Sequence, residues 1–157
     1  EATKLFQSNY AFSLRPNLRF YIEDKFSASL DLQFGRQFNK VGKADWNAYW
    51  TAEPELELKY APVKRIRFST DINFDYKQKS PPFRTDFKRV YWNAGVAADL
   101  NKKRTIALNL LVRDILNQNN GYNRNFYGNR IEEVNNLTLR RYWLLGLTWK
   151  FNKSKMN

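Results

Sequence analysis

Seven stretches of this sequence alternate apolar and polar residues over roughly a dozen positions each. In the clearest, residues 65–77, the even-numbered positions carry Ile, Phe, Thr or Tyr, and the odd-numbered positions carry charged or small polar residues. A period of two places successive side chains on opposite faces of a β-strand. Strands in soluble sheets are usually about five or six residues long, whereas membrane-crossing strands need about nine to eleven. The pattern therefore predicts an all-β, antiparallel transmembrane β-barrel fold, with about seven strands in this chain.

The connections between these strands are expected to alternate between short and long. Short turns at one rim and long loops at the other are typical of outer-membrane barrels, whose short turns face the periplasm. We predict short turns at 23–25, 61–64 and 101–103, and longer loops at 39–45, 78–86 and 117–136. The predicted strands are 10–22, 26–38, 46–60, 66–76, 90–100, 106–112 and 139–151.

Two positions disturb the alternation. Pro16 lies inside the first run and predicts an edge or a bulge, because proline has no N–H to donate. The alternation breaks after Val112, and a bulge near Arg113-Asp114 would turn the aspartate inward. A helix over 105–118 stays open as the alternative, because four of its residues also fit helical spacing: Leu108, Leu111, Val112 and Ile115.

Large aromatic residues gather toward both ends of the predicted strands. Two aromatic belts are expected where a barrel meets the two membrane interfaces. One group lies toward the long loops (Trp46, Trp50, Tyr76, Trp92 and Trp143) and the other toward the short turns (Phe20, Phe26, Tyr60, Trp149 and Phe151).

The composition excludes membrane-spanning helices but agrees with membrane-spanning strands. Aromatic residues make up 17% of the chain, yet the mean hydropathy is −0.71 and no run approaches the roughly 18 apolar residues of a transmembrane helix. In a barrel, lipid-facing residues alternate with lumen-facing ones, so the average conceals them. Cysteine and histidine are both absent, which removes thiolate metal sites and the commonest general base. We expect no enzyme activity, no metal site and no cofactor.

The net charge of +12 indicates a polyanionic partner. The basic residues are scattered over faces, turns and loops and form no single run. We therefore expect outer-membrane lipid and lipopolysaccharide as partners, and no nucleic acid. A soluble basic β-protein that binds a polyanion stays open as an alternative, and so does a plain outer-membrane porin or structural barrel.

An odd number of strands indicates part of a larger barrel. Bacterial single-chain barrels have an even number of strands, eight or more. On its own, a seven-strand sheet would leave two open edges in lipid, where unpaired backbone groups are costly. No signal peptide opens the chain, so we expect a mature protein or an internal piece of a longer one. Residues 1–157 are expected to form one C-terminal barrel segment without a separate soluble domain.

Two segments carry a resemblance to a known family. Residues 108–119 (LNLLVRDILNQN) and 139–151 (LRRYWLLGLTWKF) resemble the last two strands of TonB-dependent receptors of the Bacteroidota. In that family an Asp-x-x-Asn-Gln element precedes the last loop, and an alternating strand then ends in an aromatic residue. The corresponding residues here are Asp114, Asn117, Gln118 and Phe151.

The resemblance implies a bacterial outer-membrane transporter. Its barrel would have about 22 strands and an N-terminal plug, and import of a ligand would be driven through periplasmic TonB. The terminal strand, with Trp149 and Phe151, would be the signal that the barrel-assembly machinery reads. This chain departs from the family in two ways: residues 152–157 extend beyond Phe151, and neither a plug nor a TonB box is recognisable. The identity of the ligand stays open.

A row of carboxylates on the expected lumen side is a candidate site. Glu53, Glu55 and Glu57 share one face, and the short turn is expected to bring Arg65 and Arg67 close to them, with Asp71 further along. Such a row could bind a hard cation or do acid–base chemistry. We favour a ladder of lumen ion pairs, which would line a transport path or face the plug.

The longest loop is the candidate ligand-binding segment. Loops at a barrel rim are where ligands are bound. Aromatic rings stack on sugars or peptides, and arginine binds carboxylates or phosphates with two hydrogen bonds. A solvated loop that touches lipopolysaccharide is the alternative. The candidate residues are Tyr122, Arg124, Phe126, Tyr127 and Arg130.

Overall fold

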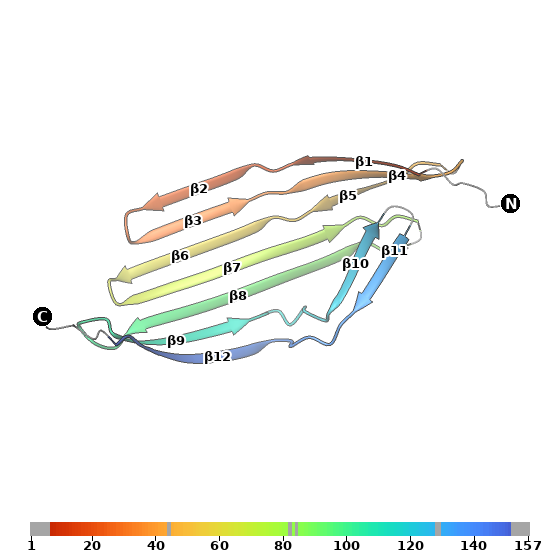
Figure 1. Ribbon diagram of the computed structural model, residues 1–157. Coiled ribbons are helices and arrows are strands. Elements are labelled where there is room, and N and C mark those ends of the chain that lie inside the picture. Colours follow the sequence, from red (N-terminus) through yellow and green to blue (C-terminus); the bar gives the residue numbers. More distant parts are fainter. Residues whose placement is uncertain (1–6, 44, 82, 84, 128–129, 152–157) are drawn as a thin grey trace, which may run out of the picture.

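The computed structural model describes residues 7–43, 45–81, 83, 85–127 and 130–151, which form an all-β, antiparallel protein. Ten strands form one sheet and two form a separate hairpin. Figure 1 shows that the hairpin lies at one end of the sheet. The sheet strands are β1 (Gln7–Leu14), β2 (Asn17–Ile22), β3 (Phe26–Asp31), β4 (Phe34–Val41), β5 (Asn47–Ala52), β6 (Glu55–Val63), β7 (Ile66–Lys77), β8 (Phe87–Asp99), β9 (Ile106–Arg113) and β12 (Tyr142–Trp149), and the hairpin strands are β10 (Tyr122–Tyr127) and β11 (Arg130–Asn135).

The seven predicted runs lie side by side in chain order, each antiparallel to the next. β1 and β2 together pair with β4 and β3, which pair with β5 and β6, and β7, β8, β9 and β12 follow in that order. The strand prediction for residues 106–112 is confirmed by β9, and the helical alternative there is wrong. One edge of the sheet is β1 and β2, and the other is β12.

Two prolines explain why seven runs give ten sheet strands. The pairing register is the same on both sides of each break, which places Pro16 opposite Leu32 and Leu32 opposite Pro54. Neither proline has an N–H, so two ladder hydrogen bonds are missing in one cross-strand row. The proline carbonyls still accept, from the N–H of Leu32 (2.9 Å) and from the N–H of Phe74 (3.0 Å). The irregularity predicted at Pro16 is confirmed, and it extends across three runs.

The sheet has one apolar face and one polar face. From β1 to β9 the registers join even-numbered residues to even-numbered ones, apart from one shift at Val63, and the β9–β12 register joins Val112 to Trp143 and Leu110 to Leu145. The face of the even-numbered residues of β1 to β9 and the odd-numbered residues of β12 is called the apolar face below, and the opposite one the polar face. The predicted division of the residues between two faces is confirmed.

The sheet has almost no buried core. Among the described residues, Tyr49 and Phe87 are the buried apolar side chains, and both belong to the polar face. Side chains of the apolar face are widely exposed, for example Phe12 at 69% and Leu145 at 73%. Within the described part of the chain, strand backbones approach only their neighbours in the sheet or hairpin, so no second layer of strands covers this face.

The connections alternate between the two ends of the sheet as predicted, but they are only partly sorted by length (Figure 1). The hairpin β10–β11 lies inside the longest connection, where an irregular loop was expected, so that prediction is wrong for its middle part. The sequence Gly128-Asn129 is the kind of two-residue pair that joins hairpin strands and could have revealed it. The short-turn end has the connections 23–25, 64–65 and 100–105, and the long-loop end has 42–46, 78–86 and 114–141. The connection 42–46 is one residue shorter than 100–105, so the predicted contrast in length fails for this pair.

Candidate functional site on the polar face

The hairpin lies against the polar face at the long-loop end of β7 and β8. Arg89 of β8 donates to the backbone carbonyl of Tyr122 (2.7 Å), and Lys77 of β7 donates to that of Arg124 (3.2 Å). Asp75 lies opposite Arg89 in the register and accepts from it at 3.0 Å. These three sheet side chains are largely buried, so the hairpin covers a charged patch, and it does so with backbone carbonyls that accept from Lys77 and Arg89.

Arg124 is the residue that anchors the hairpin. Its Nη1 donates to the carbonyl of Thr85 (2.9 Å), its Nε donates to the hydroxyl of Tyr122 (2.6 Å), and its guanidinium lies 4.3 Å from the ring centre of Phe83. The rings of Phe87 and Tyr122 are 5.8 Å apart. We call the surface under the hairpin the hairpin seat; it consists of Asp75, Lys77, Phe83, Phe87 and Arg89.

Two of the five predicted ligand-binding residues are therefore engaged within the protein. The hydroxyl of Tyr122 hydrogen-bonds to Glu133 of β11, and the Arg124 guanidinium lies 3.6 Å from the same carboxylate. Burial raises the pKa of the Tyr122 hydroxyl, which keeps it protonated and able to donate. Phe126, Tyr127 and Arg130 lie on the hairpin strands, but their side chains are outside the described part of the structure.

The sheet residues of the hairpin seat were missed by the sequence reasoning. A signal for them exists in the alternation, because Phe87 and Tyr91 are aromatic residues on odd-numbered positions of β8, which otherwise carry polar or small residues. Arg89 lies between them, with its guanidinium 5.0 Å from the Phe87 ring centre and 4.5 Å from that of Tyr91. In β8 these aromatic exceptions to the period-two pattern thus mark the place where the hairpin covers the polar face.

The Asp-x-x-Asn-Gln element forms a corner that joins three strands. The Asp114 carboxylate is buried and accepts from the N–H groups of Gln118 (2.9 Å) and Asn119 (2.8 Å). The Gln118 side chain accepts from the N–H of Val90 in β8 (2.8 Å), and the Asn117 side chain accepts from the N–H of Arg141 just before β12 (3.2 Å). Each residue of the element therefore satisfies backbone groups that the end of β9 would leave unpaired.

The predicted bulge at Arg113-Asp114 is confirmed. Asp114 has a φ of 52°, in the left-handed region. Trp92 lies opposite Asp114 if the β8–β9 register is extended, yet its carbonyl accepts from the N–H of Ile115 (2.8 Å). The one-residue shift is what a bulge produces. It turns the Asp114 carboxylate away from the apolar face, as expected.

The ladder of ion pairs between the glutamate row and the next strand is not formed. The β6–β7 register puts Glu57 opposite Asp71 and Glu55 opposite Asn73. Arg67 instead pairs with Asp99 of β8 at 2.8 Å, and Glu57 pairs with Lys59 of its own strand at 2.7 Å. Glu53 accepts from the side chain of Gln33 (3.3 Å), while Arg65 lies in the exposed turn 64–65. The predicted ladder is wrong because it assumed that the turn would bring Arg65 and Arg67 close to the glutamates, and the β6–β7 register does not do so.

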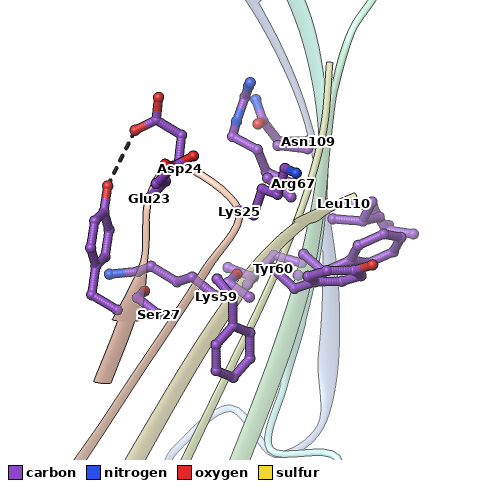
Figure 2. A pocket seen from close by; sticks show the side chains of 18 residues that line it. Glu23, Asp24, Lys25, Ser27, Lys59, Tyr60, Arg67, Asn109 and Leu110 are labelled. Atoms are coloured by element: carbon purple, nitrogen blue, oxygen red, sulfur yellow. Dashed lines mark hydrogen bonds between the residues drawn. The ribbon is translucent and has the colours of Figure 1, made fainter. Parts of the chain in front are cut away.

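A hollow of about 560 Å³ lies on the polar face near the short turns. Figure 2 shows that Lys25, Lys59 and Arg67 reach it from different strands and turns. The hydroxyl of Tyr21, which also lines the hollow, donates to the Asp24 carboxylate (3.2 Å). The residues at the bottom of the hollow are small. Gly95 has no room for a side chain there, because a Cβ would lie 3.1 Å from the Ser69 hydroxyl and 3.2 Å from a Leu111 methyl carbon. The hollow is an open recess without a catalytic pair.

No group of acidic side chains in the described part of the chain is arranged to hold a metal ion. The described residues also contain no helix that is long and apolar enough to cross a membrane. A scan against protein-family models and searches among curated proteins and solved structures found no match to this chain.

Proposed function

We propose that the apolar face of this sheet is covered by membrane lipid, and that the chain forms seven membrane-crossing spans of a larger outer-membrane β-barrel. The observation that carries the proposal is the position of the tryptophans. All five lie on the apolar face or in line with it, at Trp46, Trp50, Trp92, Trp143 and Trp149. A single layer with such a face exposed to water would be unstable, because apolar burial is the main force that favours folding.

The polar face would then line the inside of the barrel. Its ion pairs and side-chain amides suit a hydrated interior, and the hairpin lies on this side. Further strands must continue both edges of the sheet, β1 and β2 on one side and β12 on the other, because open edges are not tolerated in hydrocarbon. These strands would come from the rest of a barrel.

The activity we propose is that of a TonB-dependent receptor, which imports a ligand from the long-loop end. Support comes from the resemblance of residues 108–119 and 139–151 and from the inward-folded hairpin, which narrows the interior at that end. Ligand binding at the long loops would be followed by movement of a plug driven from the periplasm. A plain porin is the competing function, and it would need no plug.

The decisive test is whether lipid touches the apolar face. The full polypeptide, which includes the strands proposed at both edges, is refolded into vesicles that contain phosphatidylcholine brominated along its acyl chains, and tryptophan fluorescence is measured. We expect strong quenching by the brominated lipid and weak quenching by acrylamide in the aqueous phase. Circular dichroism of the same sample checks that the sheet has formed.

Two neighbouring substitutions provide a matched control. Ala28 belongs to the apolar face and Ser29 to the polar face, at the same level of β3. An added tryptophan in Ala28→Trp should be quenched by brominated lipid, whereas one in Ser29→Trp should be quenched by acrylamide. If acrylamide quenches both equally and brominated lipid quenches neither, the proposal is wrong. A soluble β-protein whose apolar face is covered by a partner would then be the better description.

A further inference from the structure

Three basic segments lie next to one another at the short-turn end of the sheet. The turn 64–65 is tied to the end of β8, where the N–H of Asp99 donates to the carbonyl of Arg65 (2.8 Å). The turn 100–105 is tied to the end of β12, where the N–H of Lys150 donates to the carbonyl of Thr105 (2.8 Å). We call their six cationic residues the basic rim: Lys64, Arg65, Lys102, Lys103, Arg104 and Lys150.

The basic rim has more positive charge than the protein itself neutralises. Asp99 is the acidic residue within it, and its carboxylate already accepts two hydrogen bonds from Arg67, with Arg104 at 4.0 Å. Within the described part of the chain, the other five cations of the rim have no ion pair, and all five are exposed. The turn 23–25 at the far side of the sheet carries Glu23 and Asp24, so the excess is confined to the β6–β12 side.

The apolar face continues up to this rim. Leu100 and Trp149 are 56% and 60% exposed, and the rings of Trp149 and Phe151 lie 4.3 Å apart beside Lys150. A ligand that satisfies the whole surface must therefore have an anionic group next to a long apolar portion. A nucleic acid or a free phosphate ion would leave the apolar part uncovered.

We propose that the basic rim binds the phosphate groups of anionic phospholipids whose acyl chains cover the adjacent apolar face. This inference rests on the lipid-facing role proposed above and adds a preference for one class of headgroup at one end of the sheet. Basic residues close to an anionic membrane surface contribute about 1 kcal/mol each, roughly a five-fold preference per residue. Loss of three of them should therefore be easy to detect.

The experiment compares two brominated lipids in otherwise identical vesicles of phosphatidylcholine and phosphatidylglycerol. The bromine is placed either on the phosphatidylglycerol or on an equal fraction of the phosphatidylcholine. The ratio is the tryptophan quenching by brominated phosphatidylglycerol divided by the quenching by brominated phosphatidylcholine. We expect a ratio clearly above one for the unchanged chain. It should decrease in Trp149→Phe, because that indole lies closest to the rim, and it should decrease at high salt, which screens exposed charges.

Two triple variants decide whether the rim is responsible. Lys64→Gln, Lys102→Gln and Lys103→Gln together should bring the ratio to about one. Lys43→Gln, Lys79→Gln and Arg140→Gln remove the same charge at the long-loop end and should leave it unchanged.

The possible failures are distinguishable. Strong quenching with a ratio of one in the unchanged chain overturns this inference and leaves the proposed function intact. Equal loss of the ratio in both triple variants also overturns it, because net charge would then be the cause. Absence of quenching by either brominated lipid overturns the proposed function and this inference together. Tight binding of a DNA oligonucleotide that only the rim variant loses, with an unchanged lipid ratio, would assign the rim to a polyanion in water.

Discussion

Arg67 and Asp99 join β7 to β8 through a two-point ion pair, in which Nη1 and Nη2 of Arg67 each lie 2.8 Å from one carboxylate oxygen of Asp99. The pair is diagonal, because the register puts Arg67 opposite Ala97. Only 4% of the Asp99 side chain is exposed, compared with 46% of the Arg67 side chain. The arginine therefore serves mainly to keep a buried carboxylate paired.

Arg67→Gln should destabilise the sheet more than the double substitution Arg67→Gln with Asp99→Asn. A buried carboxylate without its partner costs more than a neutral pair of the same shape. The measurement is chemical unfolding in detergent micelles, followed by circular dichroism. Arg65→Gln is the control, because no ion pair of Arg65 is found in the described part of the chain. If the double variant is the less stable of the two, the ion pair itself contributes and our explanation is wrong.

Asp114→Ala should destabilise the corner after β9 by about 1–3 kcal/mol, because two N–H groups lose their acceptor in a buried place. Amide hydrogen exchange provides the measurement: the N–H groups of Gln118 and Asn119 should exchange faster, while those in the middle of β7 should not. Asp45→Asn, on an exposed position, is the control. Unchanged exchange at both amides would show that the corner is held by Asn117 and Gln118 alone.

The faces of the sheet could be predicted from the sequence, because a period of two determines which side chains share a face. Trp92 and Trp143 illustrate this: their positions in separate runs predicted one common face, and the registers confirm it. Each of the first three runs is divided into two strands, and this could be predicted only in part. Pro16 signals a break in its own strand, but the break in the neighbouring strand depends on Leu32 lying between two prolines.

The partners on the polar face could not be predicted in the same way. Periodicity says that Glu57 and Arg67 share a face, but not how far β7 is shifted along β6. The actual register places an aspartate opposite Glu57 and leaves Arg67 to a carboxylate one strand further on. The hairpin seat escaped prediction for a related reason, since it forms only when a distant loop folds back on β8.

Gly121→Ala should loosen the hairpin β10–β11 at its open end, which lies next to Gly121. Gly121 has a φ of 73°, and a Cβ there would lie 1.7 Å from the carbonyl oxygen of Asn136, so the chain must rearrange. A left-handed conformation alone costs an alanine roughly 1–2 kcal/mol. Gly146→Ala is the matched control, because a Cβ on Gly146 has no heavy atom of a non-neighbouring residue closer than 4.0 Å. Hydrogen exchange in β10 and β11 should accelerate only in the first variant, and equal effects in both would contradict the role of Gly121.

Arg124→Gln should loosen the hairpin without unfolding the sheet. The substitution removes the hydrogen bond to Thr85, the one to Tyr122 and the contact with the Phe83 ring. Hydrogen bonds of a charged group contribute about 1.5–3 kcal/mol, so the amides of β10 and β11 should exchange at least roughly ten-fold faster. Arg124→Lys keeps the charge but not the planar group, so it should accelerate hydrogen exchange in β10 and β11 almost as much. Arg140→Lys, on an exposed position, is the control.

Unchanged exchange in Arg124→Gln would mean that Lys77 and Arg89 hold the hairpin by themselves. Faster hydrogen exchange would show that Arg124 holds the hairpin on its seat, and under the proposed role this affects ligand binding. The Arg124 guanidinium is occupied by groups of the protein itself, so a ligand that needs it must first displace the hairpin from its seat. An anionic ligand that accelerates hydrogen exchange in β10 and β11 of the unchanged chain, and that binds less tightly to Arg124→Gln, would show that this exchange of partners takes place.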